Sequence, residues 1–344
     1  MNDEHDPDVE RVSHPSGEWD AFVDSAGGTF CHLAGWASIF RDVLRLEPRY
    51  LVARESGTVV GVMPLVRMPR VPWGTTLVSL PFLNYGGPLG SEPVRRLLVE
   101  AAVAEARSGG DRRLEIRART PTGSDLPAGR EKVTVILDLP DDRDTLFKDR
   151  FRSKLRSQIR RPMKEGMEPR FGPEERDAFY RIFAVTMRNL GTPVLPRRLF
   201  DALVDVFPEA VEFGAVYHEG TAVAGGCGFR YGDEFEMTWA AHLWDYNRLA
   251  PNMLLYWSFM ERCIEQGVDR FNFGRCTPGG GTHRFKGQWG GEDIPLPWEA
   301  WPEAAGAPDP DAGVFDLATT VWTRLPLPVA NALGPHLARR IPTF

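Results

Sequence analysis

The residue types best suited to chemistry gather near the end of the chain, in THRFKGQWGG (282–291). His283 is a candidate general base, because imidazole has an ordinary pKa of about 6.5 and accepts a proton close to neutral pH. Lys286 lies between Phe285 and Trp289, and an amine held among aromatic rings can stabilise a developing oxyanion or anchor a phosphate. The alternatives are an exposed charge for Lys286 and a surface or hydrogen-bonded core position for His283.

A glycine-rich stretch, GRCTPGGG (274–281), directly precedes these residues. Such a stretch can cradle a phosphate when it opens a helix after a strand, but these glycines are consecutive and lack the spacing of a nucleotide-binding fingerprint. The sequence also contains no G-x-S-x-G, H-E-x-x-H or G-x-x-x-x-G-K-[ST] pattern. This argues against the common serine hydrolases, zinc proteases and P-loop enzymes.

A second group of candidates lies in EMTWAAHLWDYNRLAPN (236–252), which runs from a predicted strand to a helix opened by Pro251. In an open α/β layer, ligands bind at the carboxyl ends of strands and the amino ends of helices. Trp239, Tyr246 and Asn252 are therefore candidates for substrate contact or proton transfer. For Trp239 the alternative is aromatic packing of the strand.

The first half of the chain has a matching loop, LPFLNYGGPLG (80–90), which also lies just before a predicted helix. Asn84 and Tyr85 are the candidate binding residues there. The two glycines that follow allow a ligand to approach the backbone closely, or form a tight turn.

A basic segment separates the two halves. Residues 148–164, KDRFRSKLRSQIRRPMK, hold eight basic residues and one acid. Phe151, Leu155 and Ile159 recur at helical spacing, so we expect an amphipathic helix before Pro162. It is either a solvated connector or a contact for a polyanion such as RNA, a diphosphate-linked substrate or an anionic membrane.

The order of predicted elements repeats within the chain. The turns RESGT (54–58) and YHEGT (217–221) each join two apolar runs, which indicates hairpins, and their glycines lie 163 residues apart. Val59 to Met68 is expected to form one strand after the first turn. Each hairpin is followed by a helix, a closing glycine and another strand. This order predicts a duplicated α/β unit, with parallel pairing at each strand–helix–strand crossover.

Composition and charge are those of an ordinary globular protein. The 344 residues are 42% hydrophobic and 26% charged, with a net charge of −6 and four scattered cysteines. The acidic, polar start of the chain does not resemble a secretory signal, so we expect a cytoplasmic protein. After a linker at 302–313, Val314, Phe315, Ala318, Val321, Trp322 and Leu325 predict an amphipathic helix. It either docks on the second domain or contacts a membrane surface.

Several motifs together resemble the Fem-type (FemA/FemB-like) branch of the GNAT acyltransferase superfamily, and in particular the FemAB-like proteins of the exosortase/PEP-CTERM system. The resemblance covers residues 15–301 and 324–335. It rests on SLPFLNYGG (79–87), KLRSQIRRPMKEG (154–166), MRNLGTPV (187–194), PNMLLYW (251–257), FNFGRCTPGGGTHRFKGQWG (271–290) and RLPLPVANALGP (324–335). In MRNLGTPV we expect one helix to end at Gly191 and the next to begin at Thr192-Pro193.

The resemblance implies two GNAT-like domains in tandem and an N-acyltransferase activity. Fem transferases pass an aminoacyl group from aminoacyl-tRNA to an amine of a peptidoglycan precursor, and related GNAT members use acyl-CoA. Gly281, Phe285 and Lys286 match the family's G-x-x-x-F-K stretch. By resemblance, Phe285 stacks on the donor and Lys286 steadies the transition state.

Two features depart from the pattern of these families. GNAT enzymes bind CoA pyrophosphate through an [RQ]-x-x-G-x-[GA] turn, whereas this chain has NRLAPN (247–252). Pro251 replaces the central glycine and has no N–H to donate. The long coiled-coil arm of many Fem enzymes is also replaced by one short basic helix.

The sequence therefore predicts an α/β protein with mixed sheets and four parts: a first GNAT-like domain (1–147), a basic connector (148–166), a second GNAT-like domain (167–301) and a tail (302–344). It is expected to transfer an acyl or aminoacyl group to an amine in envelope or exopolysaccharide biosynthesis. The alternatives are a non-catalytic scaffold and a small-molecule N-acetyltransferase. No permanent cofactor or metal is expected, with acyl-CoA or aminoacyl-tRNA as co-substrate and peripheral membrane contact through the tail.

The expected site residues fall into two groups. Those expected to take part in catalysis are Lys286, His283 and Tyr246. Those expected to bind substrate are Asn84, Tyr85, Arg156, Arg160, Arg161, Trp239, Asn252, Arg275 and Phe285.

Overall fold

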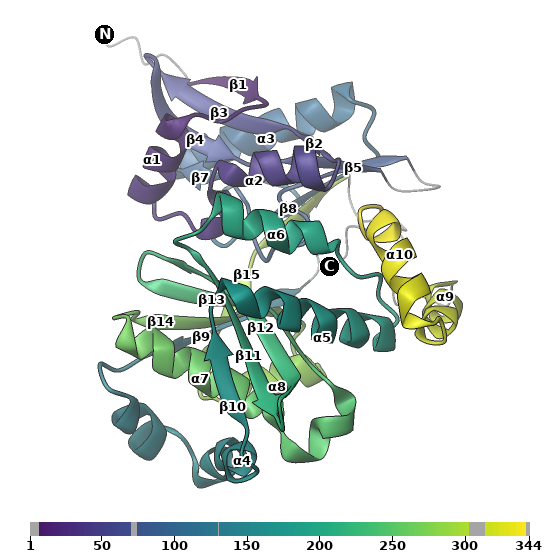
Figure 1. The fold of residues 1–344 in the computed structure, drawn as a ribbon. Helices are drawn as coiled ribbons and strands as arrows, with labels where there is room; N and C mark the ends of the chain where they lie inside the picture. The colour runs from purple at the N-terminus through teal and green to yellow at the C-terminus, as the bar shows by residue number, and fades with distance from the viewer. Residues whose placement is uncertain (1–6, 70–73, 130, 303–313, 342–344) are drawn as a thin grey trace. The chain divides into compact units, whose positions relative to one another are not determined.

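The computed structural model describes residues 7–69, 74–129, 131–302 and 314–341 (Figure 1). The chain forms two compact units. Unit 1 comprises Met1–Lys132, Pro295–Ala312 and His336–Phe344, and unit 2 comprises Val133–Ile294 and Gly313–Pro335. This division differs from the predicted boundaries, because the chain enters unit 2 before residue 147 and returns to unit 1 before residue 301.

Unit 1 contains two sheets. Its elements are β1 (Asp8–Val12), α1 (Gly17–Ser25), η1 (Phe30–His32), α2 (Gly35–Ser38), η2 (Ile39–Val43), β2 (Glu47–Pro48), β3 (Tyr50–Glu55), β4 (Thr58–Met63), β5 (Val66–Pro69), β6 (Thr75–Val78), β7 (Leu89–Gly90), α3 (Glu92–Ser108), β8 (Arg113–Arg117) and β16 (Trp298–Trp301). One sheet has the strand order β1-β3-β4-β7 and the other the order β16-β8-β6-β5-β2.

Unit 2 is built on one seven-stranded sheet. Its elements are β9 (Lys132–Asp138), η3 (Thr145–Arg150), α4 (Ser153–Lys164), β10 (Glu168–Phe171), η4 (Pro173–Glu175), α5 (Arg176–Asn189), α6 (Arg197–Val206), β11 (Val211–His218), β12 (Thr221–Tyr231), β13 (Glu234–His242), η5 (Trp244–Leu249), α7 (Pro251–Glu265), β14 (Arg270–Cys276), α8 (Gly281–Gly287), β15 (Glu292–Leu296), α9 (Val314–Thr323) and most of α10 (Leu327–Ala338). The strand order is β10-β11-β12-β13-β14-β9-β15.

Both predicted hairpins form, with the same kind of turn. Ser56 and Gly57 join β3 to β4 with φ angles of 48° and 84°, and Glu219 and Gly220 join β11 to β12 with φ angles of 49° and 76°. Two consecutive positive φ angles define the type I′ turn, whose twist matches that of the strands it joins. The local sequence was enough to predict these turns.

Each unit also has the predicted parallel crossover. In unit 1, β6 pairs in parallel with β8 after the chain passes through α3. In unit 2, β13 pairs in parallel with β14 after the chain passes through α7. Gly110 and Gly267 follow the two helices with φ angles of 70° and 69°. The repeated order of elements in the sequence is therefore a repeated order in the fold.

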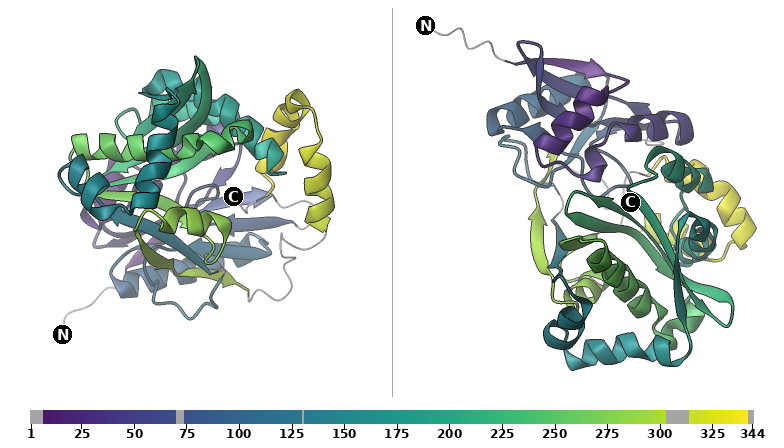
Figure 2. Two further views of the ribbon diagram at one scale, coloured as in Figure 1. Left: turned by 90° about the horizontal axis from the view of Figure 1, so that it is seen from below. Right: turned by 60° about the vertical axis from the view of Figure 1, so that its left-hand side comes forward.

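Helices cover both faces of the sheet in unit 2, as Figure 2 shows in two further views. Consecutive glycines in β12 allow this close packing, because successive residues of a strand point to opposite faces. A Cβ on Gly225 would lie 2.9 Å from the backbone of Phe179 in α5. A Cβ on Gly226 would lie 3.0 Å from the ring of Phe259 in α7.

Three local predictions differ from the structure. The expected single strand from Val59 to Met68 is divided into β4 and β5 around Pro64, which has no N–H for a sheet hydrogen bond. The helix expected to begin at Thr192-Pro193 begins at Arg197 instead, and Leu195 of the intervening segment accepts a hydrogen bond from Tyr180. The basic helix α4 continues past Pro162 to Lys164.

The tail packs on unit 2 through one of its faces. Arg188 of α5 donates hydrogen bonds to the carbonyl oxygens of Thr323 (3.5 Å) and Leu325 (3.4 Å). A Cβ on Gly334 would lie 2.9 Å from the backbone nitrogen of Val194. The linker at 303–313 and the side chains of Val314, Phe315 and Ala318 lie outside the residues that the structure describes.

Two observations bear on the expected compartment. The four cysteines are buried free thiols. Within residues 7–69, 74–129, 131–302 and 314–341, no helix has the length and apolar character needed to cross a membrane.

Candidate active site

The candidate active site of unit 2 lies where two parallel strands stop pairing. Strand β13 pairs with β14 over three positions, the last of which joins Glu236 to Asn272. Beyond this position β13 continues to His242 with only β12 as its neighbour. Thr238 forms a bulge in β13 just past this point, and such bulges redirect side chains and are frequent beside active sites.

A buried amide fixes the junction of these strands. Asn272 is fully buried in β14 and its Nδ2 donates to Glu234 Oε1 of β13 (2.9 Å). Its Oδ1 accepts hydrogen bonds from Thr134 Oγ1 of β9 (2.6 Å) and from the backbone N–H of Gly274 (2.8 Å). One side chain therefore connects three neighbouring strands.

Two carboxylates that our sequence analysis missed lie beside this amide. Glu234 and Glu236 are 8% and 1% exposed, although charged side chains are seldom buried to this degree. They alternate with Phe235 and Met237 along β13, so they share the face opposite to the apolar core. The signal was present in the sequence, because an acidic residue inside an apolar strand is unusual and indicates a specific role.

Lys286 is buried within hydrogen-bonding distance of the end of β14. Its Nζ donates to the carbonyl oxygens of Gly274 (2.7 Å) and Arg275 (2.8 Å), and the residue is 5% exposed. Burial lowers the pKa of this amine to about 8, opposed by the negative charges of Cys276 and Glu236 and assisted by Arg275. The lysine expected to steady a transition state thus also joins α8 to β14.

Both ring nitrogens of His283 already have partners. Gly279 donates its backbone N–H to Nδ1 (3.0 Å), and Nε2 lies 2.6 Å from Asp293 Oδ2. In the neutral ring the proton therefore lies on Nε2 and is donated to Asp293. The imidazole is held rigidly, but its accepting nitrogen is occupied by the loop before α8.

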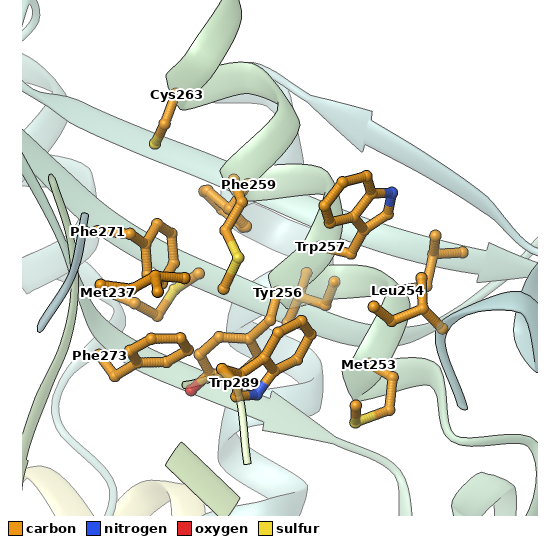
Figure 3. Packing of buried hydrophobic residues seen from close by; sticks show 14 of the residues in the cluster. Met237, Met253, Leu254, Tyr256, Trp257, Phe259, Cys263, Phe271, Phe273 and Trp289 are labelled. Carbon is orange, nitrogen blue, oxygen red and sulfur yellow. The ribbon is translucent and has the colours of Figure 1, made fainter. Parts of the chain in front are cut away.

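Aromatic rings surround the apolar side of this site, as Figure 3 shows. Tyr256 stacks on Phe273 with ring centroids 5.7 Å apart, and Trp289 lies 6.1 Å from Tyr256. The predicted donor-binding residue Phe285 joins the group, with its ring 5.1 Å from that of Tyr256. Burial raises the pKa of Tyr256, so the phenol stays protonated.

The three predicted arginines of α4 are anchored within unit 2. Arg156 donates to the carbonyl oxygens of Lys148 and Phe151, both at 2.7 Å. Arg160 lies over the ring of Phe147 at 5.0 Å, and Arg161 donates to the carbonyl of Arg248 in η5 (3.1 Å). Leu155 and Ile159 are buried as expected, so the helix presents its cations on the opposite, solvated side.

The remaining candidates of unit 2 lie around the same elements. Tyr246 in η5 packs partly against the core, with its ring 5.9 Å from that of His218. Asn252 is the second residue of α7, and Arg275 lies in β14 beside the carbonyls that Lys286 binds. Trp239 packs against Phe200 of α6 at 5.3 Å, which agrees with the aromatic-packing alternative.

The corresponding place in unit 1 is filled by the protein itself. After β6, the loop that carries Asn84 and Tyr85 runs along β8, where Ser79 N–H donates to Glu115 O (2.9 Å) and Gly86 N–H to Arg117 O (3.0 Å). Asn84 is 7% exposed and Tyr85 is fully buried. The glycines of this loop permit close packing of the chain on itself, since a Cβ on Gly87 would lie 2.6 Å from the Cα of Ala118.

The described residues contain no group of three or more His, Cys, Asp or Glu side chains arranged to hold a metal ion.

Comparison with known proteins identifies the architecture. Residues 149–287 match the family model described as "Acetyltransferase (GNAT) domain", and no curated protein sequence matches. The solved structure of FemX is similar, with a TM-score of 0.62 and 15% identity over 85% of this chain and 97% of FemX. L-PGS from Bacillus licheniformis gives 0.57 and 13% over 96% and 98% of the two chains. A tandem GNAT protein from the clavulanic acid biosynthesis pathway gives 0.51 and 14% over 86% and 98%.

At these identities the structural likeness shows the fold. The predicted α/β architecture with two GNAT-like domains is therefore confirmed.

Replacing Lys286 by methionine is expected to change how stability depends on pH. The amine has a pKa of about 8 in the folded protein and 10.5 as its ordinary value, so between these pH values the unfolded chain binds more protons. The contribution of Lys286 to the free energy of unfolding should therefore rise from pH 8 to pH 10.5. Urea unfolding across this range should show a difference between wild type and Lys286→Met that grows with pH. A constant difference would contradict the lowered pKa.

Proposed function

We propose that the protein is an N-acyltransferase whose reaction takes place in unit 2. The single observation that carries the proposal is the buried carboxylate of Glu236 at the position where β13 and β14 stop pairing. A backbone edge open to a substrate and a nearby group able to accept a proton are the two things that acyl transfer to an amine requires.

The backbone of β13 offers a place for the donor. Past Glu236 its edge is no longer paired with β14, and unpaired strand edges bind extended segments that carry amides. The pantetheine arm of acyl-CoA and the aminoacyl end of a charged tRNA both offer hydrogen-bonding groups to such an edge. In this proposal Phe285, Arg275 and Asn252 contact the donor around the same junction.

The chemistry is attack of the acceptor nitrogen on the acyl carbonyl carbon. A C–N bond forms, the C–S or C–O bond of the donor breaks, and the proton leaving the nitrogen passes to Glu236. Such proton transfer contributes typically about 10²–10⁴-fold in rate. Lys286, His283 and Tyr246 remain proposed catalytic residues, of which Lys286 has its amine closest to the end of β14 and can supply positive charge there.

The identity of the donor is proposed as one of two classes. The printed description of the tandem GNAT protein from the clavulanic acid pathway mentions acetyl-CoA, which favours an acyl-CoA donor. The similarity to FemX and the cationic side of α4 favour a polyanionic donor such as aminoacyl-tRNA. An acceptor amine in envelope or PEP-CTERM-linked biosynthesis, and substrate contacts through Trp239, Asn84 and Tyr85, rest on the sequence alone.

Replacing Glu236 by glutamine tests the proposal directly. We expect turnover with the best donor among acetyl-CoA, long-chain acyl-CoA and charged tRNA to fall about 10²–10⁴-fold, because the amide cannot accept the proton. The matched control is Glu234→Gln, which keeps the same shape on the same face of β13 and should retain most activity. Undiminished turnover in Glu236→Gln, with the same pH profile, would remove the base. Tight binding of a donor without turnover by the wild type would favour the scaffold alternative.

The basic helix generates a second prediction. Arg160→Glu/Arg161→Glu should weaken binding of a polyanionic donor at least tenfold at low salt and reduce the salt dependence by about two phosphate contacts. Arg197→Glu/Arg198→Glu on α6 makes the same change of charge elsewhere in unit 2 and should bind like wild type. Calorimetric titrations at two salt concentrations measure both. Equal loss in the two variants would show a non-specific effect of net charge.

The tail supports a proposed contact with an anionic membrane. Val329, Leu333 and Leu337 lie along one side of α10 at helical spacing and are 42%, 47% and 37% exposed. Asp316 is the only acidic residue between 314 and 341, whereas Arg324, Arg339 and Arg340 are basic. An exposed apolar stripe with flanking arginines suits an anionic bilayer surface.

Leu333→Glu/Leu337→Glu should abolish sedimentation with phosphatidylglycerol vesicles, because two carboxylates replace the apolar stripe. Wild type and the control Ala332→Glu, an exposed neighbour outside the stripe, should sediment with these vesicles and less with phosphatidylcholine. Failure of the wild type to bind, or a concentration-dependent dimer lost in the double variant, would assign the stripe to another partner.

A further inference from the structure

A pocket of about 370 Å³ lies in unit 2 away from the β13–β14 junction. It is formed by α5, by the hairpin turn between β11 and β12, and by the residue that follows β13 (Figure 1). Its lining residues are Arg181, Ile182, Val185, Tyr217, Gly220, Thr221, Ala222 and Leu243. The volume is within the range of about 300–1,000 Å³ found for sites of small ligands.

The pocket has one charged side chain, and that charge is uncompensated. Arg181 has no hydrogen bond and no ion pair in the part of the chain that the structure describes, although most arginines of unit 2 do. The hydroxyl of Thr221 is likewise without a partner among the described residues. A guanidinium and a hydroxyl at one rim provide donors for an anion, and a guanidinium matches a carboxylate in shape and charge.

A buried acid holds the opposite wall in place. Tyr217 donates its hydroxyl proton to Glu175 Oε2 (2.7 Å), and Glu175 is 7% exposed. Arg170 lies 4.2 Å above the ring of Tyr217. Burial, followed by the bond to Glu175, raises the pKa of Tyr217, so the phenol remains neutral and adds no negative charge to the pocket.

The floor of the pocket is apolar. Ile182 and Val185 of α5, Ala222 of β12 and Leu243 provide aliphatic surface with no charge. A ligand that fits must therefore combine a single negative charge at one end with an aliphatic body. A phosphate would present two charges to one arginine, which makes a carboxylate the better match.

The pocket is separate from the proposed reaction centre. Leu243 follows Glu236 by seven residues, and a strand rises about 3.3 Å per residue, so the two lie about 20 Å apart along β13. Thr186 of α5 donates to the carbonyl of His242 (3.1 Å), which connects the pocket wall to the end of the same strand. A small molecule cannot fill the pocket and reach Glu236 at once.

We propose that this pocket is a binding site for an aliphatic carboxylate, with the carboxylate on Arg181 and Thr221 and the carbon chain over Ile182, Val185, Ala222 and Leu243. The carboxylate belongs either to a free aliphatic acid or to the carboxyl terminus of a peptide that ends in an apolar residue. The two sources share the same chemistry and are distinguished by the probes below.

The test is calorimetric titration of the full chain with octanoate and with octanamide, which has the same carbon chain and no charge. Octanoate should bind wild type at least tenfold more tightly than octanamide. Arg181→Gln should remove this preference at least tenfold, and because Arg181 is exposed the variant is expected to fold normally. The matched control Arg198→Gln, an exposed arginine of α6 outside the pocket, should bind octanoate like wild type.

A second pair of probes identifies the source of the carboxylate. Acetyl-Ala-Ala-Leu as the free acid is compared with its carboxyl amide. Tighter binding of the peptide acid than of octanoate assigns the pocket to a peptide terminus, and the reverse assigns it to a free aliphatic acid.

The proposal is overturned if octanoate and octanamide bind alike, if none of the probes binds, or if Arg181→Gln binds octanoate like wild type. Glu236→Gln should bind octanoate normally, because its position is distant along β13. A failure of catalysis and a failure of this site are therefore measured separately.

Discussion

The point at which β13 stops pairing with β14 determines what unit 2 can do. Asn272 fixes that point by bonding Glu234 of β13, Thr134 of β9 and the backbone of its own strand. A one-residue slip of either strand would move its side chains to the opposite face of the sheet and bury the carboxylates in the apolar core. The position of Glu236 at the open edge of β13 therefore depends on one buried amide.

Stability and chemistry are divided between the two faces of these strands. Phe235, Phe271 and Phe273 belong to the apolar cluster packed against α7. Glu234, Glu236 and Asn272 occupy the alternate positions, where polar groups are buried only with partners. Lys286 joins the polar side through two backbone carbonyls, so part of its role is to hold α8 against β14.

The two units share an order of elements without sharing a site. Both have a type I′ hairpin and a parallel crossover, but in unit 1 the backbone of β8 is bonded by the loop that follows β6. Arg117 is 1% exposed there, donates to the carbonyl oxygens of Leu80 and Leu83 and lies 4.8 Å from the Trp298 ring. Duplication preserved the scaffold, whereas the open strand edge beside a buried acid belongs to unit 2.

The sequence by itself determined the features that depend on neighbouring residues. Gly57 and Gly220 specified the hairpin turns, Gly110 and Gly267 the helix ends, and the spacing of Leu155 and Ile159 the buried side of α4. Only the tertiary structure placed β9 between β14 and β15, returned β16 to unit 1 and brought Glu236, Asn272 and Lys286 to one junction. These contacts join residues far apart in the chain, and local propensity carries no information about which strand edge a distant segment will pair with.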